Sequence, residues 1–578
     1  MTKMGLSFMI RVLVLLVLFS PLAAAEGDRK KPARTPAKPG LIEKWRDMRF
    51  GMFVHWGPVS LKGTEIGWSR AGERRGRRPG HASKGVPVEV YDNLYKQFNP
   101  VRFDPDEWVR IAKDAGMKYL VFTTKHHDGF VNFDSKLTDY KITSPQSPYG
   151  KDIVKQLADA CHRGGLALGF YYSPPDWHHP DYRNGQRHRK YIEYLHGQIR
   201  ELCSHYGEVD ILWFDGLGGK AADWDAPKLL KTIRTLQPGI VINNRCGLPG
   251  DFSTPEQRIG GFNRQRPWET CMTICRQWAW KPDDKMKSLA QCLQTLIRVG
   301  GGDGNLLFNV GPMPDGRIEP RQAARLREMG VWLSKYGRSL YATRGGPFKP
   351  GKWGASTSQG NSLFVHVFRW NGQETLPLPP LGKTVLSCNL LTGGNVEVKQ
   401  DANGLAIHVA KAHQQEIDTI VELKLDGPAI EIPPVSVGMK SGSLACGKKA
   451  RASNVFQKQG ALYGPGKAFD DDQETRWATD AGTKEAWLEV DLATPTDIVR
   501  AVILEAYSPR VRRFELQYAD GKQWKPIARG TTIGKRKEVA FEPVRARRVR
   551  LNILDATEGP TIWEFRLFGP SAKTKPAK

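Results

Sequence analysis

Cysteine is scarce in this sequence, and its spacing does not match a zinc site. The 578 residues include eight Cys, and no two of them form a CxxC pair. Disulfide-stabilised secreted domains are far richer in cysteine, and structural zinc sites usually use closely spaced pairs. Hydrophobic residues make up 40% of the chain and aromatic residues 10%, which is enough for several cores. The composition therefore excludes a disulfide scaffold and wholesale disorder, and the length suggests about three or four domains.

The sequence also lacks nucleic-acid-binding and dinucleotide-binding motifs. It carries 86 Lys and Arg against 60 Asp and Glu, a formal net charge of +26. Such a charge is compatible with nucleic acid, an acidic polysaccharide or an anionic surface as a partner. No helix-turn-helix, zinc-finger or RNA-recognition pattern occurs, so we expect no nucleic-acid partner. No GxGxxG follows the first strand-like run, which argues against a dinucleotide-binding fold.

Long hydrophobic runs are confined to the N-terminus. Lys3 and Arg11 precede the apolar residues 12–19, and three Ala at 23–25 follow. This pattern predicts a secretory signal peptide cleaved after Ala25, and the alternative is an uncleaved anchor. The run is shorter than the roughly 20 residues of a membrane span. We therefore expect a secreted or periplasmic protein with no stable membrane span, and a basic linker at 26–40.

From residue 41 to 344, short apolar runs alternate with amphipathic stretches. Such alternation predicts an α/β fold with a parallel sheet, most economically a (β/α)₈ barrel. The strand-like runs are 50–56, 119–124, 166–172, 209–214, 239–243, 270–274 and 305–310. The helix-like stretches are 105–116, 152–164, 189–206, 226–236, 285–299 and 319–336. Asp104 and Asp152 stand where helix N-caps belong.

Nearly every strand-like run ends in polar or reactive side chains. They are His55, His126, His127, Tyr171, Tyr172, Asp215, Arg245 and Asn309. In a barrel, the carboxyl ends of all strands meet on one face, which carries the active site. The remaining sequence alternates with period two, which predicts a β-sandwich at 345–435 and a second β-rich unit at 436–570. Residues 571–578 are predicted to form a disordered tail.

Six motifs in the barrel region occur in the order of a known family. They are RFGMFVHWG at 49–57, TKHHDGF at 124–130, WFDG at 213–216, TPE at 254–256, PWETCMT at 267–273 and GNLLFNVGP at 304–312. Together they resemble the α-L-fucosidases of glycoside hydrolase family 29. The resemblance implies a retaining, exo-acting α-L-fucosidase that acts on fucosylated glycans and needs no cofactor for catalysis. The alternatives are a related α-glycosidase, such as an α-L-galactosidase, and a catalytically inactive carbohydrate-binding protein.

The catalytic residues of such an enzyme would be two carboxylates. Asp215 follows an apolar run and precedes Gly216, so its position alone fits either a nucleophile or a helix N-cap. The resemblance favours the nucleophile. It also favours Glu256 as the acid/base, with Glu269 as the second candidate. An acid that holds its proton near neutral pH is expected in an apolar pocket that raises its pKa.

Sugar-binding residues are implied at the other matched positions. They are His55, Glu65, His126, His127, Tyr172, Trp213, Arg245 and Trp278. For the adjacent His126 and His127, the alternatives are zinc binding and ordinary packing. The chain departs from the family pattern after Glu65, where five Arg occur within residues 70–78. This segment predicts contacts with a sulfated glycan, or else a solvated basic surface.

The last unit resembles discoidin, or coagulation-factor type C, domains, which share their fold with family 32 carbohydrate-binding modules. The resemblance rests on AFDDDQETRW at 468–477, AWLEVDL at 486–492 and IWEFRLF at 562–568. It implies a discoidin-like β-sandwich that binds carbohydrate. Asp470 and Asp472 in the acidic turn are candidate ligands of a structural calcium ion, because Ca²⁺ prefers carboxylate and carbonyl oxygens. The alternative is an acidic turn without metal.

Overall fold

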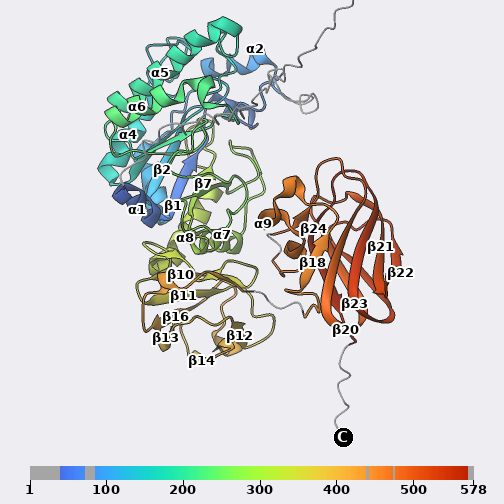
Figure 1. Cartoon of the computed structure of the whole chain (residues 1–578). Helices are drawn as coiled ribbons and strands as arrows, with labels where there is room; N and C mark the ends of the chain where they lie inside the picture. The colour runs from blue at the N-terminus through green and yellow to red at the C-terminus, as the bar shows by residue number, and fades with distance from the viewer. Residues whose placement is uncertain (1–38, 72–84, 438–441, 473–474, 571–578) are drawn as a thin grey trace, which may run out of the picture.

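The computed structural model describes residues 39–71, 85–437, 442–472 and 475–570. The chain forms three bodies in sequence order: a blue-to-green α/β body, a yellow β body and an orange-to-red β body (Figure 1). The predicted signal peptide, most of the predicted basic linker, most of the Arg-rich segment and the predicted tail lie outside the described residues. None of the described helices is both long and apolar enough to cross a membrane.

The first body contains a parallel sheet of seven strands in the order β5-β4-β3-β2-β1-β7-β6. The strands are β1 (Phe50–Val54), β2 (Tyr119–Lys125), β3 (Ala167–Tyr172), β4 (Ile211–Phe214), β5 (Val241–Ile242), β6 (Glu269–Thr273) and β7 (Asn305–Val310). All seven predicted strands are confirmed. Residues 252–256 connect the two sheet edges through single parallel bridges, from Phe252 to Asn243 and from Glu256 to Cys271. This segment occupies the eighth strand position and completes the expected (β/α)₈-type arrangement.

The helices of the first body are α1 (Pro39–Met48), α2 (Val88–Tyr91), α3 (Pro105–Asp114), α4 (Ile153–Gly164), α5 (His188–His205), α6 (Ala226–Leu236), α7 (Leu289–Gly301) and α8 (Pro320–Tyr336). Helices α3 to α8 lie where the six amphipathic stretches predict them, and α1 and α2 are additional helices that the sequence pattern does not predict. Asp104 accepts the backbone N–H of Glu107, and Asp152 accepts that of Lys155. These side chains satisfy N–H groups that the first turn leaves without a partner. The predicted helix 285–299 begins later, because Ser288 caps the helix and forms a capping box with Gln291.

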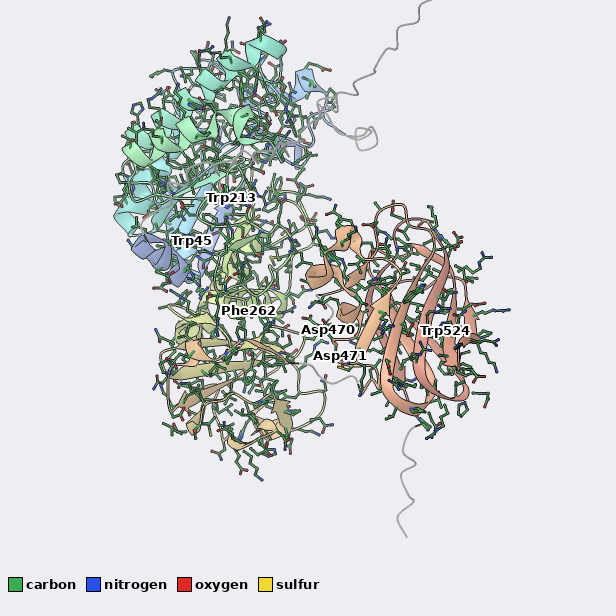
Figure 2. All side chains as sticks on the ribbon, in the orientation of Figure 1. Trp45, Trp213, Phe262, Asp470, Asp471 and Trp524 are labelled. Atoms are coloured by element: carbon green, nitrogen blue, oxygen red, sulfur yellow. The ribbon has the colours of Figure 1, made fainter. Side chains whose placement is uncertain are left out.

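The barrel interior is filled by side chains that alternate along the strands. Phe53, Tyr171, Trp213 and Leu307 belong to one buried cluster, and Figure 2 labels Trp213 within the first body. At the amino ends of the strands, the ring of Tyr119 lies directly against Gly51. A Cβ at Gly51 would lie 2.3 Å from that ring. Glycine at this position therefore lets Tyr119 cross the bottom of the barrel.

The second body packs two antiparallel sheets around one core. A five-stranded sheet has the order β13-β16-β11-β10-β8, and a three-stranded sheet has the order β12-β15-β14. The strands are β8 (Arg344–Gly345), β9 (Phe348–Lys349), β10 (Gly354–Gln359), β11 (Ser362–Val367), β12 (Thr375–Leu378), β13 (Val385–Leu390), β14 (Glu397–Asp401), β15 (Gly404–His408), β16 (Thr419–Leu425) and β17 (Val435–Ser436). Trp353, Leu363 and Val421 lie in their shared core. The β-sandwich expected at 345–435 is therefore present.

The third body is built around two long, bent strands. Its elements are β18 (Lys449–Ala452), α9 (Gly460–Tyr463), β19 (Trp477–Ala478), β20 (Ala486–Glu505), β21 (Val511–Asp520), β22 (Gln523–Gly530), β23 (Lys537–Ala556) and β24 (Thr561–Phe568). The pairing of β20 with β23 shifts register after Asp491 and again after Ile498. Such bulges bend a strand. The first half of β20 therefore pairs with β18 and the second half with β24, as expected for a discoidin-like fold.

Candidate active site

The strand ends bring the candidate residues to the carboxyl end of the barrel. His55 follows β1, His126 and His127 follow β2, and Asp215 follows β4. Arg245 follows β5, and Glu256 ends the segment in the eighth strand position. Parallel strands in a barrel share one direction, so residues far apart in sequence meet here.

Arg245 joins the two candidate carboxylates. Its Nη1 lies 3.2 Å from Asp215 Oδ1 and 2.8 Å from Glu256 Oε2. Because both oxygens lie against one nitrogen, they can be no more than about 6 Å apart. A separation of about 5–5.5 Å is typical of retaining glycosidases, and inverting enzymes use a wider gap. The geometry therefore suits direct attack by one carboxylate with proton donation by the other.

The two carboxylates differ in exposure. The Asp215 side chain is 14% exposed and that of Glu256 is 43% exposed. The apolar pocket expected around the acid is absent, since Glu256 is open to solvent and paired with Arg245. Arg245 is itself held in place, because its Nε donates to the Thr254 hydroxyl and its Nη2 to the Thr254 carbonyl. Its guanidinium also lies over the ring of Trp213.

Tyr171, and not Tyr172, reaches the site. The Tyr171 hydroxyl donates to Asp215 Oδ2 at 3.0 Å, whereas Tyr172 donates to Gln198 on α5. Neighbouring residues of a strand point to opposite faces, so only one of the pair can face the barrel interior. The prediction of Tyr172 as a sugar-binding residue is therefore wrong. Burial, followed by the charge of Asp215, raises the pKa of Tyr171 well above its usual value, so the hydroxyl remains a donor.

The two tyrosines offer a matched test of this assignment. Tyr171→Phe should lower kcat roughly tenfold to a hundredfold, because Asp215 loses a donor that fixes its carboxylate. Tyr172→Phe should leave kcat unchanged and cost about 1 kcal/mol of unfolding free energy, since it loses only a hydrogen bond to α5. Steady-state kinetics and thermal unfolding of both variants check this. Equal kinetic losses in the two variants would contradict it.

The histidines of the site are neutral and oriented by their neighbours. Burial lowers the pKa of His55 to about 3 and that of His127 to about 4, and it lowers the pKa of His126 well below its usual value. His55 Nδ1 lies 2.6 Å from Asn309 Oδ1, and the Asn309 amide nitrogen donates to the Trp278 carbonyl. Because Asn309 Oδ1 is the acceptor, His55 carries its proton on Nδ1. Its Nε2 is therefore an acceptor.

His127 is fixed in the same tautomer by a different partner. Ser173 Oγ donates to the Pro175 carbonyl, so it accepts from His127 Nδ1, which lies 2.6 Å away. His127 Nε2 is then a bare acceptor, buried without a hydrogen-bond donor among the described residues and 3.5 Å from Asp215 Oδ2. A hydroxyl placed between these two acceptors could donate to either one.

Glu269 lies at the opposite end of the barrel from Asp215. It is the first residue of β6 and pairs in register with Asn305, the first residue of β7. Its carboxylate is fully buried and accepts from the Tyr119 hydroxyl at 2.5 Å and from Trp213 Nε1 at 3.0 Å. Burial raises its pKa to about 7. Glu269 as the acid/base is therefore wrong, because it lies beneath Trp213 and cannot reach a substrate above it.

Glu65 holds the loop that carries Trp278. Its two carboxylate oxygens accept the backbone N–H groups of Trp278 and Ala279, each at 3.1 Å. The ring of Trp278 lies 4.8 Å from that of His55 and 6.0 Å from that of Phe53, between centroids. Trp278 therefore forms an aromatic wall beside the histidines, and Glu65 positions this wall.

The third body has a separate cavity at the loop end of its sandwich. This cavity of about 370 Å³ is lined in part by Phe456, Tyr463, Arg476, Tyr507 and Arg510. The Arg476 guanidinium lies 5.0 Å from the Tyr463 ring centroid and 5.4 Å from that of Tyr507. Aromatic faces fixed beside guanidinium donors are suited to the apolar and hydroxyl surfaces of a sugar.

Oxygen atoms converge on Thr475 beside the acidic turn of the third body, where Figure 2 labels Asp470 and Asp471. Thr475 Oγ1 lies 2.7 Å from Asp470 Oδ2 and 3.2 Å from the carbonyl oxygens of Lys467 and Asp472. In the same body, both carboxylate oxygens of Glu564 are buried without a hydrogen-bond partner among the described residues. Burial raises the pKa of Glu564 to about 8, and the nearby charge of Asp471 adds to the effect.

Metal-binding clusters of the usual kind are not seen in the described ranges. No group of three or more His, Cys, Asp or Glu side chains there is arranged to hold a metal ion. Of the two adjacent histidines, His126 stacks on Tyr171 with an interplanar angle of 7°. The donors around Thr475 include a hydroxyl and two carbonyl oxygens, which are ligand types that Ca²⁺ accepts in addition to carboxylates.

Comparisons with known proteins place the barrel in one family. The family model described as Alpha-L-fucosidase matches residues 20–338, and the F5/8 type C domain matches 449–565. Alpha-L-fucosidase isoenzyme 1 from Paenibacillus thiaminolyticus is 35% identical, with a TM-score of 0.60, over 67% of this chain and 99% of that chain. A GH29 alpha-L-fucosidase from Bacteroides thetaiotaomicron, a trapped covalent intermediate in complex with 2-fluoro-fucosyl fluoride, is 29% identical with a TM-score of 0.62. That match covers 69% of this chain and 98% of the other.

A curated relative gives the same result. The tissue alpha-L-fucosidase of Macaca fascicularis is 29% identical over 434 residues, covering 68% of this chain and 92% of the relative. The family model alone covers more than half of the 578 residues. The chain is therefore a glycoside hydrolase of the alpha-L-fucosidase family GH29 with a C-terminal F5/8 type C domain.

Proposed function

We propose that this protein is a secreted, retaining α-L-fucosidase that removes terminal α-L-fucosyl residues from glycans by double displacement. The observation that carries the proposal is the position of Arg245 between the Asp215 and Glu256 carboxylates. That spacing leaves room for an anomeric carbon and its leaving oxygen, without room for an intervening water. Secretion rests on the signal-like sequence at residues 1–25, which lies outside the described residues.

In the first step, Asp215 attacks the anomeric carbon and forms a glycosyl ester. The bond between the anomeric carbon and the leaving oxygen breaks, and Glu256 transfers its proton to that oxygen. Tyr171 and Arg245 hold the Asp215 carboxylate in one orientation before the attack. In the second step, Glu256 removes a proton from water, the water oxygen bonds to the anomeric carbon, and Asp215 leaves as a carboxylate.

Sugar recognition is assigned to the neutral histidines and the aromatic wall. The Nε2 atoms of His55 and His127 accept hydrogen bonds from sugar hydroxyls, and burial keeps both rings uncharged across neutral pH. Trp278, which packs on the buried ring of Phe53, gives the methyl group of fucose an apolar surface. The hydroxymethyl group of L-galactose would bring an additional hydroxyl to this side, which favours fucose over the α-L-galactosidase alternative.

A comparison of aryl glycosides tests the proposed substrate. The full chain should hydrolyse an aryl α-L-fucoside faster than the matching α-L-galactoside and should not hydrolyse the β-D-galactoside. Faster hydrolysis of the α-L-galactoside than of the α-L-fucoside would instead identify the enzyme as an α-L-galactosidase. No hydrolysis of any of the three would favour the catalytically inactive carbohydrate-binding alternative.

The third body is proposed to bind carbohydrate through the cavity lined by Tyr463, Arg476 and Tyr507. It is further proposed to hold a structural calcium ion at the oxygen cluster around Thr475. Asp470, Thr475, Glu564 and the carbonyl oxygens of Lys467 and Asp472 would hold the ion. The buried Glu564 carboxylate supports this proposal, because it accepts no hydrogen bond among the described residues and its ion pair with Arg566 is long, at 3.6 Å. Burying a carboxylate with so little compensation is costly unless a cation neutralises it. The Asp472 side chain is not needed in this ligand set.

Calcium removal should destabilise the third body. At a calcium concentration a hundred times the dissociation constant, the ion contributes about 3 kcal/mol to the unfolding free energy. Thermal unfolding of the full chain should therefore shift to lower temperature when a chelator is added. Glu564→Gln should reduce this shift strongly, whereas Glu558→Gln on the surface should not. A wild-type transition that is identical with calcium and with chelator would exclude the ion.

A further inference from the structure

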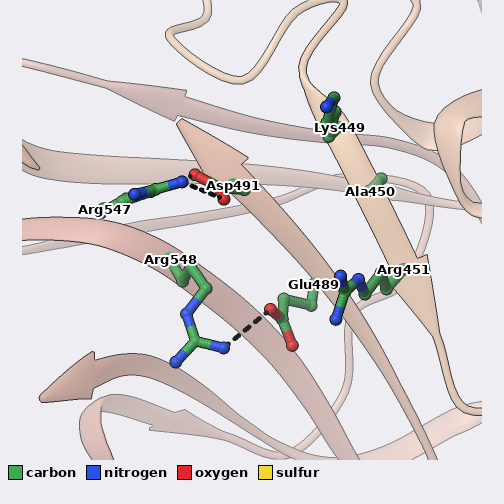
Figure 3. A pocket seen from close by; sticks show the side chains of 7 residues that line it. All are labelled: Lys449, Ala450, Arg451, Glu489, Asp491, Arg547 and Arg548. Carbon is green, nitrogen blue, oxygen red and sulfur yellow. Dashed lines mark hydrogen bonds and ion pairs between the residues drawn. The ribbon is translucent and has the colours of Figure 1, made fainter. Parts of the chain in front are cut away.

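One solvent-facing side of the third body carries a charged groove that the proposed function does not use. The groove has a volume of about 520 Å³ and is lined by Lys449, Ala450, Arg451, Glu489, Asp491, Arg547 and Arg548. These residues come from β18, β20 and β23 (Figure 3). Alternate residues of β20, Leu488 and Val490, are buried in the core. Glu489 and Asp491 of β20 therefore face outward by the alternation of the strand.

The charges form two rows across three strands. Lys449 pairs in register with Asp491, and Asp491 with Arg548. Arg451 pairs with Glu489, and Glu489 with Arg550. Each row thus runs positive, negative, positive from β18 across β20 to β23, but Arg550 lies outside the lining of the groove, where its guanidinium contacts Gln517 and Trp524. Arg547 adds a further cation at the edge of the groove.

The two carboxylates neutralise only part of this positive charge. Arg547 makes two hydrogen bonds to Asp491, at 2.8 and 3.0 Å, and Arg548 lies 3.5 Å from Glu489. Within the described residues, neither Lys449 nor Arg451 has a carboxylate within ion-pair distance, and both are exposed. Four cations therefore line the groove with two carboxylates, and the groove favours an anionic ligand.

The arrangement of the charges selects a ligand with more than one anionic group. Neighbouring strands lie about 4.8 Å apart, so the cation columns on β18 and β23 are separated by roughly 10 Å. The carboxylates of β20 lie between these columns and would repel an anion placed midway. A ligand with several anionic groups can place them on both sides of β20, whereas a single sulfate or phosphate ion could contact one column only. The arrangement therefore favours a polyanion.

The central carboxylates also indicate what lies between the anionic groups. Asp491 and Glu489 can accept hydrogen bonds from hydroxyl groups. A sulfated polysaccharide carries both sulfates and free hydroxyls, whereas the backbone of duplex DNA has no hydroxyl donors. Single-stranded nucleic acid usually stacks its bases on aromatic rings, but the Trp524 ring is already covered by Arg550 at 4.3 Å and by Arg548 at 5.4 Å.

We propose that the β18-β20-β23 groove binds a sulfated polysaccharide, with sulfates on the two cation columns and sugar hydroxyls on the central carboxylates. The choice of a polysaccharide over other polyanions rests in part on the proposed fucosidase function. The groove would hold the enzyme on a sulfated glycan while the barrel removes terminal fucose. It is distinct from the loop-end cavity around Arg476, because the two share no lining residue.

Binding of the full chain to dextran sulfate, measured by titration calorimetry, tests the proposal. Lys449→Gln combined with Arg451→Gln should weaken binding on the order of tenfold and reduce its salt dependence, because two counterion-releasing contacts are lost. Neither side chain forms an ion pair with another described residue, so the fold should persist. Lys228→Gln combined with Lys231→Gln on α6 removes the same charge from an exposed surface and should leave binding unchanged.

Three further results would overturn the proposal: equal losses in the two double variants, no binding of dextran sulfate by the wild type, or tighter binding of duplex DNA than of dextran sulfate at matched ionic strength. Uncharged dextran of the same length should bind much more weakly. Hydrolysis of an aryl α-L-fucoside is measured on the same samples and should be unchanged in both variants. Failure of the wild type to hydrolyse it would count against the fucosidase function, and would leave the groove to be judged by its binding alone.

Discussion

Asp215→Gly should reduce turnover of an aryl α-L-fucoside roughly ten-thousandfold or more, because the covalent step loses its nucleophile. The fold should persist, since the Asp215 side chain is partly exposed and its partners Tyr171 and Arg245 have other contacts. Added azide should restore turnover by attacking the anomeric carbon in the space left by the carboxylate. The product should then be a β-fucosyl azide, because attack from that face inverts the configuration once.

Asp159→Ala provides a matched control for this variant. Asp159 is an exposed carboxylate on α4 that pairs with Lys155, far from the strand ends. Its loss should change neither turnover nor the response to azide. Near-normal activity of Asp215→Gly, or a lost activity that azide does not restore while the protein remains folded, would remove Asp215 from the nucleophile role.

Glu256→Ala should show the second-largest effect, and the size should depend on the leaving group. With a natural glycan or a poor aryl leaving group, the rate should fall about a hundredfold to ten-thousandfold, because the departing oxygen needs a proton. With a strongly activated aryl group, the first step should be much less affected. The measurement is the rate for a series of aryl fucosides, plotted against the pKa of the leaving group.

Glu269→Gln tests whether Glu256 or Glu269 is the acid/base, a choice for which the sequence offers both residues. Glu269 lies beneath Trp213 and does not reach the carboxyl end of the barrel. Any loss in this variant should therefore be the same for every leaving group, since it would act through the position of Trp213. A leaving-group slope in Glu269→Gln, with none in Glu256→Ala, would reverse the assignment.

The sequence predicts the barrel well because each element has its own local signal. Asp104 and Asp152 mark helix starts through N-cap chemistry, and buried parallel strands appear as continuous apolar runs. The eighth strand position lacks such a signal. Residues 252–256 read Phe-Ser-Thr-Pro-Glu and make only single bridges to their neighbours. Their place in the barrel is set by closure of the sheet, which is a tertiary effect.

The errors in the candidate site have a common cause. Tyr171 and Tyr172 are chemically alike, and choosing between them requires knowing which side chains of β3 point into the barrel. Tyr171 pairs with Trp213 and Tyr172 pairs with Phe214, so Tyr171 faces the barrel interior with Trp213. Alternation along β4 places Trp213 on the same side as Asp215, and this pattern is the signal in the sequence that could have identified Tyr171. Glu269 is the second candidate for the acid/base because it belongs to the PWETCMT motif, but its position at the start of β6 places it at the opposite end of the barrel from Asp215.

The charged groove could not be predicted at all from local pattern. Lys449, Asp491 and Arg548 are far apart in the sequence and become neighbours only through the register of β18, β20 and β23. Each residue alone is an ordinary exposed charge in a chain of net charge +26. The Arg-rich segment at 70–78, which the sequence singled out for sulfated glycans, lies mostly outside the described residues, and its role stays a prediction.

In the proposed mechanism, Asp215 forms the covalent bond to the sugar. The most direct test is to incubate the full chain with 2-fluoro-fucosyl fluoride, digest it, and identify the modified peptide by mass spectrometry. One fluorofucosyl adduct should form, on the peptide that contains Asp215, and it should be lost in Asp215→Gly. An adduct on a peptide with another carboxylate, or turnover by a wild-type protein that never accumulates an adduct, would show that Asp215 is not the nucleophile.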